Sequence, residues 1–511
     1  MAGTKRFAFN VMMNWAAMAV SMVVPFFLTP FVVRHLGATA YGIWILAVST
    51  VSYLNLLDFG LRSAVIRFVS KATAQQNNED ATSAIGAALW FRLIIAASVA
   101  VLSIGLSLAF PHFFKIPRDM QSAAQITVLL CALGVGITLI SGVFGAVLSA
   151  INRFDILSSI TMVQTAARAV GVLTILNTGH GLVTLAYWEL TIVVLSGIVT
   201  CVIALRSYPP CRVRIGRPDM VVLKKIWAYS FTTFIFIIAV QIIVNTDNLV
   251  VGAFLSVGVV AFYSIGSSLI GYTAQVVGAL STTFTPLASG LEASGRSADL
   301  QRLLLRGTQA SLAIAMPIGL TLFFRGRTFI GLWMGPQYSQ ISGTVLQILM
   351  ISLYFAIADS TAGSIMMAID KHKPVARWAV YEATLNLGLS LLLVKTIGIY
   401  GVALGTSIAM TLVHVLFWPK YVQSILNVPI RTFLWEGWAK IPLCAIPFAL
   451  ICYLADRYWH ATNLAIFFGQ IVLTLPIYAI SLLVIFRNEA RSLFLRWKNS
   501  RVLQPEPSLF S

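Results

Sequence analysis

The feature that most constrains this chain is a series of apolar segments, each about 20 residues long, that recurs from end to end. A segment of that length crosses the hydrocarbon core of a bilayer as an α-helix. Hydrophobic residues make up 58% of the 511 positions and charged residues only 10%, which is outside the range of soluble globular proteins. The chain is therefore predicted to be an all-α integral membrane protein without a separate soluble domain.

About fourteen transmembrane helices are predicted from these segments. Their expected ranges are 11–33, 41–60, 84–110, 122–147, 156–177, 182–205, 226–254, 258–286, 307–325, 343–369, 375–395, 398–418, 440–459 and 464–486. The first apolar stretch is long and has no clear cleavage site after it, so it is expected to be a retained helix rather than a signal peptide.

The positive charge of the chain is explained by its orientation in the membrane. A net charge of +18 could suit a nucleic-acid partner, but Lys and Arg also collect on the cytoplasmic side of membrane proteins. With the predicted spans, most of the 35 Lys and Arg residues fall on the side of the N-terminus. Both termini are therefore expected in the cytoplasm, and no nucleic-acid partner is predicted.

Motifs for enzymatic or ATP-driven chemistry are absent from the sequence. It has no G-x-x-x-x-G-K-S/T loop to cradle a nucleotide, and its five cysteines are too scattered for an expected metal site or disulfide. A membrane glycosyltransferase or polymerase would need catalytic carboxylates in an accessible loop, where Asp119 and Asp456 stand alone. The chain is predicted not to be an enzyme and to use neither a cofactor nor a metal.

A polar motif occurs twice, 218 positions apart. AINRFD spans 150–155 and AIDKHK spans 368–373, each between the fourth and fifth helix of its half. The chain is therefore expected to form two pseudo-symmetric six-helix lobes, 1–215 and 216–425, around a central cavity. Helices 13 and 14 follow in 426–487, and 488–511 form a basic cytoplasmic tail. Such a duplication favours a transporter, although it could also merely build a large bundle.

The repeat aligns two polar stripes, one on the fifth helix of each half. Gln164 and Arg168 in the first half correspond to Glu382 and Asn386 in the second. Each pair is four residues apart and therefore shares one face of its helix. Polar side chains are not satisfied by lipid, so both stripes are expected to face the bundle interior or one central cavity.

Basic residues within the spans suggest an anionic cargo. Arg168, Arg92 and Arg67 are candidate substrate-binding residues, together with Gln164 and Asn386, because a guanidinium matches phosphate through its forked donors. The alternative for Arg168 is a structural ion pair with Glu189 on the next helix. Arg92 could instead reach the headgroups of the inner surface.

Acidic residues within the spans suggest coupling to an ion. Glu382, Asp359 and Asp247 are candidates for a group that exchanges with a proton or sodium ion, since a buried carboxylate needs a partner or a purpose. Polar contacts between helices are the alternative for Asp359 and Glu382, and a cap or local pair is the alternative for Asp247. His414 also lies in a span, at a lower cost when neutral.

Several of these segments resemble one known family. FLTPFVVRHLGATAYGIWIL, LLDFGLRSAVIRFVSKA and VNTDNLVVGAFLSVGVVAFYSI, together with the AINRF and AIDKHKP loops, are similar to the polysaccharide or O-antigen repeat-unit flippases. These belong to the multidrug/oligosaccharidyl-lipid/polysaccharide flippase superfamily. The resemblance implies two lobes that alternate between inward-open and outward-open states in the bacterial inner membrane.

The same resemblance implies a cargo. An undecaprenyl-diphosphate-linked oligosaccharide repeat unit would move from the cytoplasmic to the outer leaflet for surface or exopolysaccharide synthesis, lipopolysaccharide included. Its diphosphate and sugars would enter the cavity while the tail stays in lipid. Membrane lipids are expected partners, and a polysaccharide polymerase and glycosyltransferases are plausible ones by pathway logic. The alternative is a cation-coupled multidrug exporter, whose cavity would favour acidic and aromatic groups.

Overall fold

The computed structural model describes residues 2–209 and 220–486, and every regular element in these ranges is helical. Thirteen helical runs in this part are long and apolar enough to cross a membrane. The first run, Phe9–Ala74, has 66 residues, which is enough for two crossings at 1.5 Å per residue. Counting it twice gives fourteen crossings, so the predicted all-α membrane fold is confirmed.

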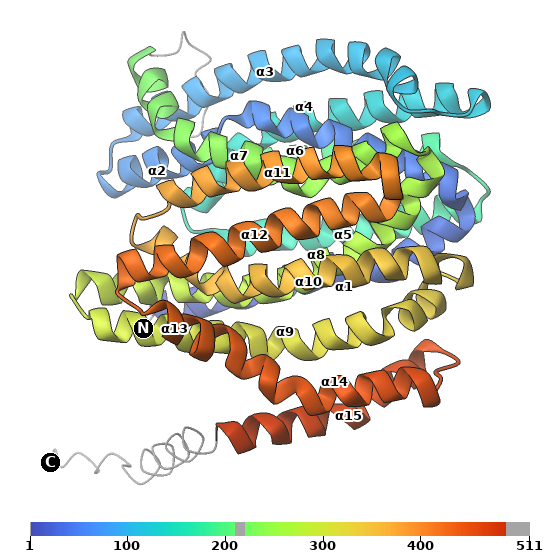
Figure 1. Ribbon diagram of the computed structural model, residues 1–511. Coiled ribbons are helices and arrows are strands. Elements are labelled where there is room, and N and C mark those ends of the chain that lie inside the picture. The colour runs from blue at the N-terminus through green and yellow to red at the C-terminus, as the bar shows by residue number, and fades with distance from the viewer. Residues whose placement is uncertain (1, 210–219, 487–511) are drawn as a thin grey trace, which may run out of the picture.

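The helices run nearly parallel to one another, and the α14–α15 pair lies at one edge of the bundle beside α9 (Figure 1). The N-terminal half contains α1 (Ala2–Ser52), the 3-10 helix η1 (Tyr53–Asp58), α2 (Leu61–Ala74), α3 (Asn78–Phe113), the 3-10 helix η2 (Arg118–Met120), α4 (Gln121–Ala150), α5 (Phe154–Asn177) and α6 (Leu182–Ser207). The C-terminal half contains α7 (Met220–Phe254), α8 (Val257–Ala293), α9 (Ser297–Trp333), α10 (Pro336–Ala368), α11 (Lys373–Ile397) and α12 (Ile399–Leu426). After these come α13 (Ile430–Thr432), the π-helix η4 (Phe433–Ala439), α14 (Lys440–Tyr458) and α15 (Leu464–Ile485).

Successive crossings alternate in direction, which defines two faces of the molecule. The face at which α1 begins is called the N-terminal face here, and the opposite one the far face. The turns after α4 and α10 lie at the N-terminal face, whereas those after α3, α7 and α9 lie at the far face. The first far-face turn is at Gly37, whose φ of 76° ends the first crossing within α1.

The second crossing is broken near its middle. Phe59 and Gly60 adopt φ values of 48° and 74°, and two consecutive left-handed residues cannot continue a right-handed helix. The prediction of one uninterrupted helix over 41–60 is therefore wrong at its end: α1 gives way to η1, and α2 starts at Leu61. Asp58 and Arg62, on either side of this break, therefore lie near the middle of the second crossing.

Both halves of the chain use the same helix pairings. In the first half α3 packs on α4, α4 on α6 and the first crossing of α1 on α5; in the second, α9 packs on α10, α10 on α12 and α7 on α11. The repeated motif makes the same turn twice. Asn152 and Asp370 have φ values of 57° and 55°, and Asn and Asp are the non-glycine residues that tolerate this conformation best. The duplication is therefore visible in both packing and backbone.

The two halves share an apolar core at the far face. One cluster of buried residues combines Leu46, Phe110 and Ala124 of the first half with Val257 and Val402 of the second, among others. At the N-terminal face the buried cluster around α2, α3, α4 and α6 contains residues of the first half only. The lobes are thus joined at the far face and have separate cores at the N-terminal face.

The C-terminal helix pair is fixed to the second half by buried polar contacts. Arg325 of α9 is 2% exposed; its guanidinium donates to Gln470 of α15 and lies 4.6 Å from the centre of the Phe467 ring. Tyr478 donates to the Ala313 carbonyl oxygen at 2.9 Å. The predicted lobe boundary at residue 215 and the basic tail 488–511 lie outside the described residues.

Candidate functional site

The break in the second crossing carries an ion pair. Asp58 at the end of η1 accepts a hydrogen bond from Nη2 of Arg92 on α3. Arg92 is 2% exposed, and its Nη1 donates to the Leu139 carbonyl oxygen at 2.6 Å. Gly142 makes room for this guanidinium, because a Cβ there would lie 2.5 Å from Nη1. The structure therefore places Arg92, a predicted substrate-binding residue, in an internal pair.

Arg62 is a second cation near this pair and is not part of it. It begins the first turn of α2, four residues after Asp58, and its side chain is exposed. It lies close enough to Arg92 for the two positive charges to repel each other. Because Asp58 can neutralise only one of the two guanidinium groups, the described residues around the break carry a net positive charge at Arg62.

Arg62 borders a polar cavity of about 1030 Å³ that extends from the N-terminal face into the first lobe. The cavity lies between α1, α2, α4 and α5. Its polar lining residues are Asn10, Asn14, Ser21, Arg62, Ser149, Asn152, Ser158 and Thr161. Arg62 is the charged residue in this lining, and Oδ1 of Asn10 is buried without a hydrogen-bond partner among the described residues. An anionic group with many hydroxyls would find matching partners here.

A mainly apolar groove of about 500 Å³ is lined by the next stretch of α1. The cavity is lined by α1 residues up to Ser21, and the groove is lined from Met22 onwards. The groove continues between α8, α9 and α15, where Tyr272, Phe329 and Phe467 contribute to its wall. Successive stretches of α1 thus line a polar chamber and an apolar groove, an arrangement that suits an amphipathic molecule.

Arg168, the predicted mid-depth anion ligand, is also paired. Its Nε and Nη2 donate to the two carboxylate oxygens of Glu189 on α6, at 2.7 and 2.6 Å. Its side chain remains 39% exposed, so it is still accessible. Gln164, one turn away, is half-buried. The structure therefore shows the ion pair that the sequence offered as the alternative for Arg168.

The corresponding stripe of the second half is buried. Asn386 is 1% exposed, and its side-chain amide donates to Thr406 Oγ1 at 3.2 Å. Thr406 in turn donates to Asp247 at 2.6 Å, and Tyr263 donates to the same carboxylate oxygen at 2.5 Å. These bonds link α7, α8, α11 and α12, so Asn386 and Asp247 lie in one internal network rather than on a cavity wall.

Asp359 and Glu382 come together through a residue that the sequence had left without a role. His414 of α12 lies with Nδ1 2.9 Å from Asp359 Oδ2 and Nε2 3.8 Å from Glu382 Oε2. Asp359 is 1% exposed and Glu382 7%. Three ionisable side chains from α10, α11 and α12 thus form one buried cluster, which we call the C-lobe triad.

The last of the predicted residues, Arg67, is exposed on α2 and takes part in a contact within the structure. The predicted sites therefore do not converge on one cavity. Arg168 and Gln164 lie on α5, Arg92 is enclosed, and the three acidic candidates occupy two separate networks in the second half. The sequence places Arg62 with Arg67 in the basic stretch that follows the predicted helix 41–60, but Arg62 was not among the predicted ligands; the structure places it in the cavity lining.

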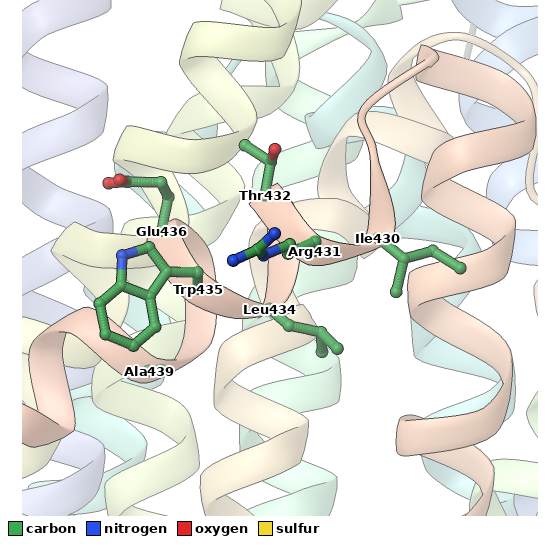
Figure 2. Close-up of a pocket in the computed structure, with 7 residues that line it drawn as sticks. All are labelled: Ile430, Arg431, Thr432, Leu434, Trp435, Glu436 and Ala439. Atoms are coloured by element: carbon green, nitrogen blue, oxygen red, sulfur yellow. The ribbon is translucent and has the colours of Figure 1, made fainter.

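A second surface pocket lies at the N-terminal face, between α12 and α14. It has a volume of about 880 Å³, and Figure 2 shows Arg431, Trp435 and Glu436 projecting from the short helical segment that forms it. Gln309 and Tyr354 bind the carbonyl oxygens of Glu436 and Trp438. Exposed Trp and Arg side chains are typical of helices at the membrane–water interface.

Comparisons with known proteins identify the family. The model of the family described as polysaccharide biosynthesis protein matches residues 31–343, which is more than half of the chain. The chain belongs to this family. The predicted resemblance to the polysaccharide flippases is thereby confirmed.

Two relatives and one solved structure show the extent of the similarity. The chain is 24% identical to the uncharacterized membrane protein EpsK of Bacillus subtilis (strain 168) over 84% of this chain and 85% of the relative. It is 22% identical to a putative O-antigen transporter of Shigella flexneri, covering 75% and 90%. The lipid II flippase MurJ, in an inward closed conformation, superimposes with a TM-score of 0.72 at 16% identity, over 94% and 99% of the two chains.

Proposed function

We propose that this protein is a flippase that moves undecaprenyl-diphosphate-linked oligosaccharide repeat units from the cytoplasmic to the outer leaflet of the bacterial inner membrane. The family membership and the relative named as an O-antigen transporter support a polysaccharide-related, lipid-linked cargo. The distribution of Lys and Arg supports cytoplasmic termini, so the N-terminal face would be the cytoplasmic one. The product would serve cell-surface or exopolysaccharide synthesis.

The observation that carries this proposal is that successive stretches of α1 line a polar cavity and an apolar groove. The cargo has a charged, hydroxyl-rich head and a long polyprenyl tail. The head would occupy the cavity beside Arg62, while the tail would lie along the groove between α1, α8 and α15. Transport would then keep each part of the cargo in an environment that matches its polarity.

The basic residues would act in sequence. Arg67 and Arg62 on α2 would meet the diphosphate as it enters from the inner leaflet, because both are exposed on the same broken crossing. Arg168 is half-exposed, so a phosphate oxygen could replace Glu189 in its bidentate pair. Arg92 would contribute only in a conformation in which Asp58 has left it, and Gln164 and Asn386 would provide polar contacts around the sugars.

Alternating access is supported by the unequal joining of the lobes. The lobes are held by a common core at the far face. Polar contacts from α7 to the second crossing continue from there toward mid-depth: Asn248 to Ser49 at 3.1 Å, Thr246 to Tyr53 at 2.6 Å and Gln241 to Ser52 at 2.5 Å. The cavity is on the other side. We therefore interpret this conformation as one that receives cargo from the cytoplasmic leaflet and is closed toward the outside.

Ion coupling would use the carboxylates of the second lobe. Asp359 and Glu382 lie in the C-lobe triad, and Asp247 has one buried carboxylate oxygen without a hydrogen-bond partner among the described residues. A buried carboxylate that lacks full compensation favours uptake of a cation. Exchange of that cation between the two sides of the membrane would then bias the two lobe arrangements.

The alternative is a cation-coupled multidrug exporter. The lining of the cavity favours the flippase, because it contains Arg62 and no carboxylate among its described residues. An organic cation would be repelled by that charge. A polysaccharide polymerase and glycosyltransferases are proposed partners, since they would consume and supply the cargo.

Translocation in proteoliposomes tests the proposal directly. Fluorescent undecaprenyl-diphosphate N-acetylglucosamine would be incorporated in both leaflets, and its movement would be followed by quenching from outside. Efflux of a fluorescent organic cation would be measured in the same preparation. Movement of the lipid probe without cation efflux supports the flippase, whereas cation efflux alone would assign the protein to the drug exporters.

A further inference from the structure

The C-lobe triad has an unusual spacing that suggests a specific role. His414 is held firmly on one side, since Nδ1 lies 2.9 Å from Asp359 Oδ2. On the other side Nε2 lies 3.8 Å from Glu382 Oε2, which is beyond hydrogen-bond distance. The imidazole therefore stands between two carboxyl groups but bonds to only one of them.

That gap responds to the presence of one proton. With a neutral imidazole that donates through Nδ1, the lone pair of Nε2 faces the oxygen of Glu382, and two electron-rich atoms repel each other. A proton added to either atom turns the repulsion into a charge-assisted hydrogen bond and draws α11 and α12 together. The position thus has two states that differ in spacing.

The groups packed around the C-lobe triad are apolar, neutral or bonded to other partners. From α7, the apolar residues Ala239 and Phe236 pack toward α11. From α8 and α9, Ser281 and Ser311 contribute hydroxyls, which bond to the residues that follow Asp359 on α10. The other titratable or charged groups nearby pair elsewhere: on α10 the Tyr354 hydroxyl donates to the Trp438 carbonyl oxygen at 2.6 Å, and Lys440 pairs with Glu436 at 3.1 Å. The Trp438 indole of η4 lies beside Asp359.

We propose that the gap between His414 Nε2 and Glu382 Oε2 holds the coupling proton of the transport cycle. This inference rests on the proposed function and narrows its coupling ion to a proton. An imidazole nitrogen is a poor ligand for sodium, which prefers a shell of oxygen atoms, but it takes up and releases protons at physiological pH. His414 is then a positioning residue for the proton, and Glu382 is its partner.

A route connects this gap to the far-face closure. Glu382 is next to Ala383 on α11, and Ala379 and Ala383 pack against Ala239 of α7. Two residues beyond Ala239, Gln241 begins the row of α7 side chains that bond to the second crossing. A change in spacing between α11 and α12 would therefore be transmitted through α11 to α7, the helix whose side chains bond to the second crossing.

The first test measures the proton requirement of transport. Proteoliposomes with the fluorescent undecaprenyl-diphosphate N-acetylglucosamine would be given a pH gradient, a sodium gradient or neither, for the wild type, His414→Gln and Glu382→Gln. His180→Gln, at an exposed turn, is the matched control. We expect a several-fold stimulation by the pH gradient in the wild type and control, and none in the two triad variants.

Stimulation of both triad variants by the pH gradient would overturn the proposal, as would a wild type that responds only to sodium. A second readout is independent of cargo: alkylation of a cysteine introduced at Ser158 in the cavity, measured by mass spectrometry between about pH 5 and pH 8. Because the thiolate is the reactive form and its fraction rises with pH, the rate is divided by that of the same cysteine in the unfolded protein at each pH. This ratio should change with pH in the wild type and not in His414→Gln or Glu382→Gln. A wild type that moves no probe but shows this pH response would reject the flippase function alone, and equal responses in all variants would reject the triad.

Discussion

Arg168 and Glu189 form a bidentate ion pair between α5 and α6, with both carboxylate oxygens engaged at 2.7 and 2.6 Å. The pair lets a predicted transmembrane charge exist without a bound ligand, because each partner neutralises the other. Gly171 supports it: a Cβ there would lie 1.9 Å from the Trp188 ring, so glycine allows α6 to approach α5 at this level.

The first prediction concerns this pair. Removal of one partner leaves an unpaired charge, so Arg168→Ala and Glu189→Ala should each lower the melting temperature. Adding the second substitution to either single variant should lower it by less than that substitution does in the wild type. Thermal unfolding in detergent would measure the cycle, with a coupling of about 0.5–3 kcal/mol expected for residues in contact. Strictly additive losses would show that the pair contributes nothing to the fold.

The second prediction uses the space around Arg92. Gly142→Ala puts a methyl group 2.5 Å from Nη1, which must displace the guanidinium from the Leu139 carbonyl oxygen and from Asp58. A loss of about 1–3 kcal/mol is expected from overpacking and an unsatisfied cation. Gly136→Ala on the same helix is the control, because its Cβ would meet neighbours at 3.6 Å or more. Equal melting temperatures of the two variants would argue against this account of Arg92.

The third prediction concerns the far-face closure. A Cβ at Gly42 would lie 2.0 Å from the Val257 carbonyl oxygen, so Gly42→Ala should force α1 and α8 apart there. Alkylation of a cysteine at Ser158 in the cavity should then slow, because the lobes shift from the inward-facing arrangement. Gly258→Ala, whose Cβ would make an ordinary 3.7 Å contact with Thr39, should leave the rate unchanged. Faster or unaltered alkylation in Gly42→Ala would count against closure at this face.

The fourth prediction separates the two polar stripes. Asn386→Ala should lower the melting temperature, because Thr406 loses a donor in the buried network around Asp247 and a cavity remains. Gln164→Ala, at a half-buried position, should change the free energy of unfolding by less than about 0.5 kcal/mol and the melting temperature correspondingly little. The opposite order would mean that the stripe on α5 is the structural one.

The sequence was sufficient for those features that follow from one-dimensional patterns. Apolar length predicted the crossings, and the repeated motif predicted the duplication, since Asn152 and Asp370 suit the left-handed turn that both copies make. The acidic residues of the second half stand out in the sequence, because an ionisable group in a membrane span needs a partner.

The identity of those partners could not be read from the sequence. Glu382 meets His414 only because α11 and α12 cross at one depth, and Arg92 meets Asp58 only because the second crossing breaks at Phe59 and Gly60. Positions that look free in a linear list become paired through packing. The same break places Arg62 beside the Asp58–Arg92 pair, with no carboxylate partner of its own among the described residues. Its surplus charge depends on neighbours in space and not on its own segment.

The most direct test of the whole account is the rate at which Arg62 variants move fluorescent undecaprenyl-diphosphate N-acetylglucosamine across proteoliposomes. Loss of one charge-assisted contact to phosphate should slow Arg62→Ala about tenfold or more, and Arg62→Lys should recover part of that rate. Arg118→Ala, at the exposed far face, should match the wild type. If Arg62→Ala moves the probe at the wild-type rate with equal protein in the vesicles, the cavity beside α2 does not bind the cargo head and the account fails.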